Sequence, residues 1–314
     1  MSTTANLAFV FPGQGSQKVG MLADFYQEGS VFKQTFDEAQ AALGYDLWAL
    51  IQSGTQDELN MTEVTQPALL ACSVALWRKW QADGGAQPAY MSGHSLGEWS
   101  ALVCAGVVAF EDALRLVRSR GKYMQEAVPA GVGAMAAIIG LDDAAVEAAC
   151  ATAAEGGDIV SPVNYNSPGQ LVIAGMKAGV EKAMELCKEA GAKRALPLPV
   201  SAPFHTALMK PAADKLAAEV EAVEFKTPLI PVVHNVTAKT EADANTIKAL
   251  MIQQISAPVL WVDCVNELVA LGVEKTVECG PGKVLSGLNK RIQKSLAVSA
   301  TETTDLFAEA LANA

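Results

Sequence analysis

A short glycine-rich motif has the spacing of a serine nucleophile. Residues 93–97 have the sequence GHSLG, preceded by a short apolar run at 89–92 and followed by an apolar, helix-like stretch. Between a strand and a helix, a GxSxG motif forms a sharp turn that exposes the serine hydroxyl. The amides that begin the helix then face the charge that develops on an attacked carbonyl. We predict that Ser95 is a nucleophile, with a simple tight turn as the alternative.

A serine nucleophile needs a base, and the chain contains three histidines. His94 lies inside the turn itself, where its ring is badly placed to reach the hydroxyl of its neighbour. His234 lies in the middle of an expected strand, which favours a packed or hydrogen-bonded side chain. His205 ends the sequence SAPFH at 201–205, a break directly after an expected strand, where a catalytic loop would lie. We predict that His205 is the base.

No acidic residue is an evident third member of a triad. In ordinary α/β-hydrolases the order along the chain is serine, acid, histidine. The acidic residues between Ser95 and His205 lie mostly on expected helices or between residues 130 and 200, and none follows an evident strand end. A backbone or amide carbonyl is therefore a candidate for orienting the imidazole.

A second glycine-rich loop offers backbone donors. The sequence GQG at residues 13–15 follows an expected strand at 7–11 and presents free N–H groups. Such a loop can complete an oxyanion hole, although a plain turn is the commoner role. The loop is not a GxGxxG sequence and lacks the Gly-Lys-Ser/Thr ending of a P-loop, so nucleotide binding has little support.

Arg120 is a candidate anion-binding residue. It lies within an expected helix at 112–125, in the sequence VRSRGKYM. An arginine in the middle of a helix is most often solvated or ion-paired at the surface. Its planar guanidinium also suits a carboxylate, which it can hold with two parallel hydrogen bonds. The residue and its spacing alone leave both roles open.

Composition and charge argue against several classes of protein. The 314 residues are 51% hydrophobic and carry a net charge of −11, from 23 basic and 34 acidic residues, which disfavours a nucleic-acid binder. The six cysteines form no CxxC pair and no Cys/His cluster, so neither a zinc site nor a disulfide framework is expected. The apolar run at 7–11 is too short for a signal-peptide core, and no apolar stretch approaches the about 20 residues of a membrane helix. We expect a soluble, cytoplasmic protein.

The order of expected strands and helices indicates the fold class. Between residues 130 and 200 the pattern is βαββαβ, with strands at 133–140, 159–165, 170–174 and 194–200 and helices at 142–154 and 180–190. This ferredoxin-like pattern is long enough for a small inserted subdomain. Strands and helices alternate on both sides of it, which predicts an α/β fold with a mainly parallel sheet. The helices expected there lie at 66–80, 112–125, 211–220 and 260–271, and the later strands at 231–236 and 276–278.

Eight segments in register carry a family resemblance. They are FVFPGQGSQ (9–17), TQPAL (65–69), GHSLGE (93–98), SRGKYM (119–124), GAMAAIIG (133–140), NYNSPGQLVIAG (164–175), SAPFH (201–205) and ECGPGKVLSGL (278–288). In order and spacing the chain resembles the malonyl-CoA:acyl-carrier-protein transacylases of bacterial type II fatty-acid synthesis over nearly its whole length. The resemblance implies a large α/β-hydrolase-like catalytic domain, residues 1–129 and 201–314, with a ferredoxin-like subdomain at 130–200.

The resemblance also implies a reaction and its partners. Ser95 matches the family's nucleophile, His205 its base, and Arg120 the residue that grips the malonyl carboxylate. The implied enzyme transfers malonyl from malonyl-CoA to the phosphopantetheine thiol of holo-acyl carrier protein through a malonyl-serine intermediate, with ping-pong kinetics. We expect no cofactor, no metal, no nucleic-acid or membrane partner, and a monomer.

Two backbone amides and one carbonyl complete the implied catalytic group. Gln14 and Leu96 match the oxyanion hole through their main-chain N–H groups. Gln254 matches the residue whose main-chain carbonyl orients the histidine, which would account for the missing acid. Gln253 is an adjacent alternative if the alignment slips by one.

Further positions are candidates for the acyl pocket. Phe204 precedes the base, and in related polyketide acyltransferases an aromatic there accompanies malonyl, whereas serine accompanies methylmalonyl. Asn is usual in the family where His234 stands; because Asn235 is retained, we expect a small effect. Asn166 and Asn235 are candidate pocket-lining residues.

Three other functions remain as alternatives. A serine hydrolase would need an acidic triad member and no Arg120. A non-catalytic module that docks carrier protein would lack the serine or the histidine. An acyltransferase for an uncharged acyl-CoA would have no use for the arginine.

Overall fold

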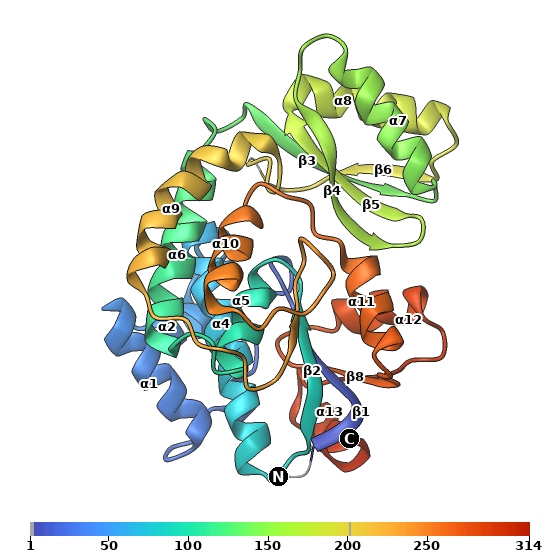
Figure 1. Ribbon diagram of the computed structural model, residues 1–314. Helices are drawn as coiled ribbons and strands as arrows, with labels where there is room; N and C mark the ends of the chain where they lie inside the picture. Colours follow the sequence, from blue (N-terminus) through green and yellow to red (C-terminus); the bar gives the residue numbers. More distant parts are fainter. Residues whose placement is uncertain (1–2, 201) are drawn as a thin grey trace.

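The computed structural model describes residues 3–200 and 202–314. Ser201, the first residue of the segment predicted to carry the base, lies outside the described residues. Two separate sheets organise the chain (Figure 1), and the candidate site lies where they approach each other.

The larger sheet has five parallel strands in the order β7-β2-β1-β8-β9. Their bounds are β1 Thr3–Phe11, β2 Gln87–Gly93, β7 Val232–Val233, β8 Lys275–Glu278 and β9 Ala297–Ala300. Alternate side chains of β1 enter different cores: Phe9 and Phe11 lie in one hydrophobic cluster, and Ala8 and Val10 in another. Both faces of this sheet are therefore buried, as parallel sheets require.

Helices cover both faces of the larger sheet. The cluster around Phe9 and Phe11 takes side chains from α1 Val31–Leu43, α2 Leu47–Ser53, α3 Gln56–Asn60, α4 Thr62–Ala82, α5 Leu96–Cys104, α6 Phe110–Glu126, α9 Lys210–Ala222, α10 Ala244–Gln253 and α13 Thr304–Asn313. The opposite cluster takes them from α11 Trp261–Ala270 and α12 Val284–Ile292. Two short 3₁₀ helices lie at Ala23–Phe25 and Ala207–Met209. Figure 1 shows α11 and α12 on the side of the sheet away from α4 and α6.

The smaller sheet is antiparallel, with strands in the order β4-β5-β3-β6. Its elements follow the predicted βαββαβ order: β3 Gly133–Ile139, α7 Asp143–Ala154, β4 Val160–Ser167, β5 Gln170–Met176, α8 Lys177–Glu189 and β6 Arg194–Pro197. One face packs on α7 and α8 around a core of its own that includes Ile138, Val146 and Ile173. The α/β fold class is confirmed; the boundaries 1–129, 130–200 and 201–314 stay a prediction.

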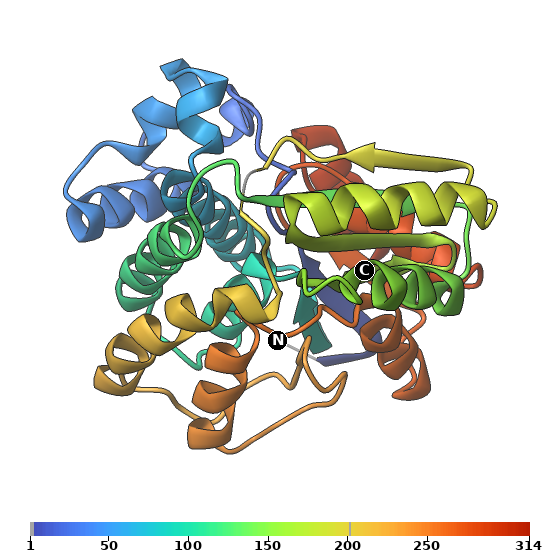
Figure 2. The ribbon, with the colours of Figure 1, turned by 90° about the horizontal axis from the view of Figure 1, so that it is seen from above.

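The two sheets are tied together by packing and by main-chain hydrogen bonds. Met135, Val163 and Val172 face away from α7 and α8 and join the core of the larger part. The N–H of Val259 donates to the carbonyl of Val163 (2.8 Å), and the N–H of Tyr165 donates to the carbonyl of Val259 (3.0 Å). Figure 2, seen from above, shows the smaller sheet and its helices beside α9 and α10.

Several element limits differ from those expected. The strand predicted at 231–236 stops at Val233, because the chain turns back and the N–H of Ala238 donates to the carbonyl of His234. His234 therefore follows the strand instead of lying within it. The helix predicted at 66–80 begins at Thr62, so Pro67 is its sixth residue and not part of its first turn.

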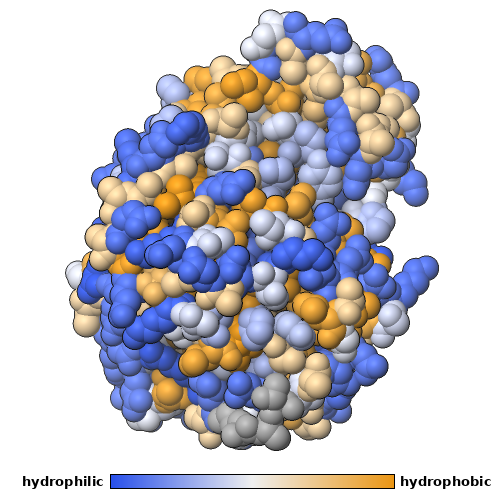
Figure 3. Space-filling view, viewed as in Figure 1, coloured by the Kyte–Doolittle hydropathy of each residue, from blue (hydrophilic) through white to orange (hydrophobic). Residues whose placement is uncertain are grey.

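The surface has no extended hydrophobic band on the face shown in Figure 3, where hydrophobic residues appear in separate patches between hydrophilic ones. The large hydrophobic side chains that stay exposed lie on different elements: Met61, Ile159, Leu196, Leu229 and Val284. None of the helices within residues 3–200 and 202–314 is both long enough and apolar enough to cross a bilayer. The cytoplasmic location stays a prediction.

Candidate active site

Ser95 occupies a sharp turn between β2 and α5. Its φ of 52° and ψ of −107° lie in a region that non-glycine residues rarely adopt. A Cβ on Gly93 would overlap the backbone of Gly97, and one on Gly97 would overlap the carbonyl of Phe11. Both glycines of the motif are therefore needed for close backbone approach, and the predicted strand–turn–helix context is confirmed.

The hydroxyl of Ser95 lies against the ring of His205. The Oγ–Nε2 distance is 2.8 Å, and Nδ1 lies 2.8 Å from the main-chain oxygen of Gln254. A carbonyl can only accept, so Nδ1 carries the proton and donates to Gln254. Nε2 of the neutral ring then accepts the hydrogen bond from the Ser95 hydroxyl. A carbonyl occupies the place that a carboxylate has in an ordinary triad.

His205 is held neutral by its surroundings. The side chain is 4% exposed. Burial lowers its pKa to about 3, and the positive charge of Arg120 beside it acts in the same direction. The ring is therefore free of the extra proton at neutral pH, as a general base must be.

Arg120 is buried, not solvated, so the expectation of a surface arginine is wrong. Nη1 donates to Oε1 of Gln66 (2.8 Å), and Nη2 donates to Oε1 of Gln254 (2.9 Å) and to Oγ of Ser95 (3.1 Å). These partners are neutral, and Nε has no partner in the described part of the chain. Burial lowers the pKa to about 10, which the charge of Glu98 partly offsets, so the guanidinium stays cationic at neutral pH.

The two candidate oxyanion donors line the same cavity as Ser95. Gln14 and Leu96 both contribute to its wall. The N–H of Leu96 begins α5 and so has no acceptor within that helix. The N–H of Ser95 itself is occupied, because it donates to Oδ1 of Asn235 (2.8 Å).

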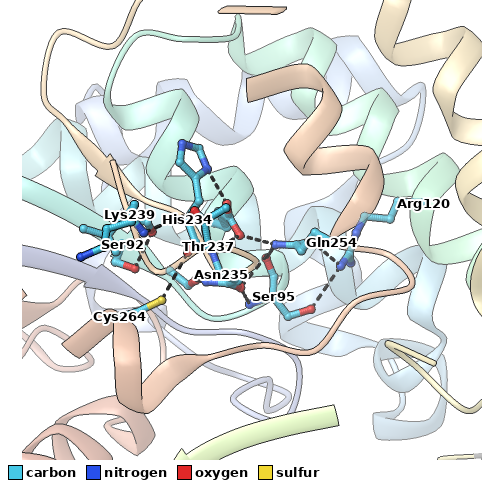
Figure 4. Close-up of polar contacts among 12 residues, drawn as sticks. Ser92, Ser95, Arg120, His234, Asn235, Thr237, Lys239, Gln254 and Cys264 are labelled. Carbon is cyan, nitrogen blue, oxygen red and sulfur yellow. Dashed lines mark hydrogen bonds and ion pairs between the residues drawn. The ribbon is translucent and has the colours of Figure 1, made fainter. Parts of the chain in front are cut away.

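Asn235 holds the turn from behind. Its Nδ2 donates to the carbonyl of Gly93 (2.7 Å), while its Oδ1 accepts from Ser95 (Figure 4). Asn166 bonds to the ring of His94, with Oδ1 2.8 Å from Nε2. Neither asparagine contributes to the wall of the cavity, where Asn164 stands instead.

The remaining predicted residues separate clearly. Gln254, and not Gln253, presents its carbonyl to the base. Phe204 lines the cavity. His94 points away from the Ser95 hydroxyl toward β4, as expected, and His234 bonds to the buried carboxylate of Glu98, with Nδ1 2.7 Å from Oε1.

Comparison with known proteins gives the family. The model of the acyl transferase domain matches residues 8–305. Malonyl CoA-acyl carrier protein transacylase of Escherichia coli (strain K12) is 61% identical over 304 residues, 97% of this chain and 98% of that protein. The crystal structure of an acyl carrier protein S-malonyltransferase from Vibrio cholerae has 60% identity and a TM-score of 0.95, covering 97% of this chain and 99% of that one.

The chain belongs to the malonyl CoA-acyl carrier protein transacylase family. It is an acyltransferase enzyme, and the family resemblance found in the sequence is confirmed. A solved complex, described as a type II PKS acyl-carrier protein in complex with its malonyl-transacylase, is also similar. Its matching chain is 57% identical with a TM-score of 0.96, covering 98% of this chain and all (100%) of that one.

Three residues close to Ser95 escaped the sequence analysis. Gln66 and Glu98 lie inside the segments TQPAL and GHSLGE, whose match to the family marked them without assigning a task. Met135 comes from β3, and only the packing of the two sheets brings it to the cavity. A polar residue inside an otherwise buried helix, such as Gln66 on α4, was the available signal.

Proposed function

We propose that the chain transfers malonyl from malonyl-CoA to the phosphopantetheine thiol of acyl carrier protein through malonyl-Ser95. One observation carries the proposal: the Ser95 hydroxyl lies within hydrogen-bond reach of both a neutral base, His205, and a buried cation, Arg120. A base activates the hydroxyl. A cation without a carboxylate partner suits an acyl group that carries its own.

The first half-reaction acylates the serine. Nε2 of His205 takes the proton as Oγ of Ser95 attacks the thioester carbonyl, and the oxyanion accepts hydrogen bonds from the Gln14 and Leu96 amides. The carbon–sulfur bond then breaks, and the coenzyme A sulfur leaves with the proton held by His205. The products are malonyl-Ser95 and the free thiol.

The second half-reaction repeats these steps with another thiol. His205 takes the proton of the phosphopantetheine thiol, whose sulfur attacks the ester carbonyl of malonyl-Ser95. The intermediate collapses, and Oγ of Ser95 leaves with the proton from His205. The scheme requires no bound cofactor, and the acceptor is supported by the similar transacylase solved with its acyl-carrier protein.

Arg120 supplies the preference for malonyl over acetyl. The free carboxylate pairs with the guanidinium, whose Nε lacks a partner among the described residues. An acetyl group leaves that buried donor unpaired, which disfavours the complex. A hydrolase has less support, because its base is expected to bond to an acid and that of this chain bonds to a carbonyl.

The test follows where the malonyl group goes. Wild-type protein is given malonyl-CoA with holo-carrier protein or with apo-carrier protein, which lacks the thiol. We expect malonyl-carrier protein only with the holo form, and parallel lines in double-reciprocal plots. Free malonate as the main product in both mixtures would identify a hydrolase and contradict the proposal.

A further inference from the structure

Arg120 poses an electrostatic problem before substrate arrives. Its side chain is 1% exposed, and its hydrogen-bond partners Gln66, Ser95 and Gln254 are all uncharged. A charge taken out of water is costly unless an opposite charge compensates it. A carboxylate in direct contact would compensate, but it would also compete with the substrate for the same donors.

Glu98 is the other buried charge beside the site. It lies on α5, three residues after Ser95, and is 1% exposed. Its Oε2 accepts from the N–H of Asn235 (3.2 Å) and from Nε2 of Gln254, while Oε1 faces Nδ1 of His234. Three donors converging on one carboxyl group favour its ionised form.

His234 supports the charge of Glu98 without cancelling it. Nδ1 lies 2.7 Å from Oε1 of the carboxylate, whereas Nε2 is buried with no partner within the described residues. A doubly protonated ring would leave a buried N–H unsatisfied, so the neutral tautomer with its proton on Nδ1 fits this position. The pair therefore keeps one negative charge.

The amide of Gln254 links Glu98 to Arg120. Nε2 donates to Oε2 of Glu98 and to the carbonyl of Ser95 (3.0 Å), and Oε1 accepts from Nη2 of Arg120 (2.9 Å). Figure 4 shows this amide between the two side chains. Hydrogen bonds in series polarise one another, so a carboxylate at one end strengthens the amide oxygen as an acceptor at the other.

We propose that Glu98 is a positioning residue that acts as the indirect counter-charge of Arg120 through the Gln254 amide, leaving the guanidinium edge free for the substrate carboxylate. His234 holds this counter-charge in place. The charge of Glu98 also raises the pKa of Arg120 against the effect of burial. The assignment of the substrate carboxylate rests on the proposed function; the coupling of the two buried charges does not.

Glu98→Gln separates the charge from the hydrogen bonds. An amide oxygen at the place of Oε2 still accepts from Asn235 and Gln254. An amide nitrogen at the place of Oε1 donates to Nδ1 of His234, once the ring carries its proton on Nε2. The variant therefore retains shape and partners and loses only the negative charge.

The first experiment measures the coupling by thermal unfolding. Glu98→Gln is made in the wild type, in Arg120→Met, which removes the cation, and in Arg120→Lys, which keeps it. We expect Glu98→Gln to lower the unfolding midpoint by at least about 2–4 °C in the wild type and in Arg120→Lys. In Arg120→Met it leaves the midpoint unchanged or raises it, because Glu98 is then the unpaired buried charge.

Equal losses in all three backgrounds would overturn the proposal and leave Glu98 a purely structural residue. If Glu98→Gln alone does not fold, the proposal still requires the double variant Glu98→Gln/Arg120→Met to fold. Failure of that double variant would contradict it.

The second experiment uses malonate as the probe, with sodium chloride of equal ionic strength as the control. A bound carboxylate replaces the missing counter-charge, so malonate raises the unfolding midpoint of Glu98→Gln more than that of the wild type. A smaller shift in the variant would overturn the proposal. Charge coupling in the first experiment, with no malonate shift in either protein, would uphold the coupling and contradict the proposed malonyl site.

Discussion

The hydroxyl oxygen of Ser95 lies 3.1 Å from Nη2 of Arg120. The candidate nucleophile and the candidate carboxylate anchor are therefore neighbours, although they come from α6 and from the turn before α5. A malonyl group attached to Oγ needs to extend by only one carbon beyond its carbonyl to bring its carboxylate to the guanidinium. This adjacency underlies the acyl preference proposed for the enzyme.

Arg120→Ala tests that preference. We expect kcat/KM for malonyl-CoA to fall about 10²–10³-fold, since charge-assisted hydrogen bonds are each worth about 1.5–3 kcal/mol. The value for acetyl-CoA changes little. Arg115→Ala is the matched control, because Arg115 lies on the same helix in an exposed pair with Asp112. Equal losses for both acyl groups would rule out a carboxylate clamp.

The pH profile reports on the same pair of charges. Arg120 contributes to the low pKa of His205, so a carboxylate that neutralises Arg120 raises that pKa in the enzyme–substrate complex. We expect the acid limb of kcat for acylation by malonyl-CoA to lie at higher pH than that of kcat/KM, which reports the free enzyme. Coincident limbs would show that Arg120 does not sense the acyl group.

Stability should also depend on the protonation of His205. Its pKa in the folded state, about 3, lies below the ordinary value of 6.5, so the unfolded chain binds the extra proton more readily. The contribution of His205 to stability is complete above pH 6.5 and falls by up to about 1.4 kcal/mol per pH unit between 6.5 and 3. Urea unfolding at pH 7.5 and 5.5 should show a larger loss for the wild type than for His205→Gln. An identical loss would mean that the folded ring titrates normally.

Fold class and the central pair of residues could be predicted from sequence because they depend on local signals. The GxSxG spacing needs a strand, a turn and a helix, and all three are adjacent in the chain. Gln254 is different: its carbonyl meets His205 only because α10 ends beside the loop that carries the base. No spacing encodes such a contact, and only the family resemblance pointed to it.

The burial of Arg120 was hidden for a related reason. A helix pattern shows which residues share a face, but not whether a second element covers that face. Here α4 packs on α6, and Gln66 of α4 reaches the guanidinium. The early end of β7 was likewise invisible, because Val232 to Val236 is interrupted by a turn that depends on Lys239 accepting a hydrogen bond from His234.

Gly97→Ala tests the close packing of the turn. The added Cβ would overlap the carbonyl of Phe11, so we expect loss of malonyl transfer and a destabilisation of several kcal/mol at about the scale of overpacked cores. Gly287→Ala on α12 is the control, because nothing lies within 4 Å of its added Cβ. That change should stabilise by about 0.5–1 kcal/mol. Wild-type stability of Gly97→Ala would show that the turn can relax.

His234 offers a test of the buried polar layer. His234→Leu leaves Oε1 of Glu98 without its donor, which should cost about 1–3 kcal/mol in the free energy of unfolding. His234→Asn places an amide nitrogen at the position of Nδ1 and should cost much less. Denaturant unfolding distinguishes them, and equal costs would mean that the hydrogen bond to Glu98 contributes little.

The covalent intermediate is the most direct test of the proposed mechanism. Wild type, Ser95→Ala and Arg120→Ala are each mixed with malonyl-CoA, and their intact masses are recorded before carrier protein is added. We predict one malonyl adduct per wild-type chain, none on Ser95→Ala and a weak one on Arg120→Ala. An adduct of equal yield on Ser95→Ala, or none on the wild type, would contradict the account.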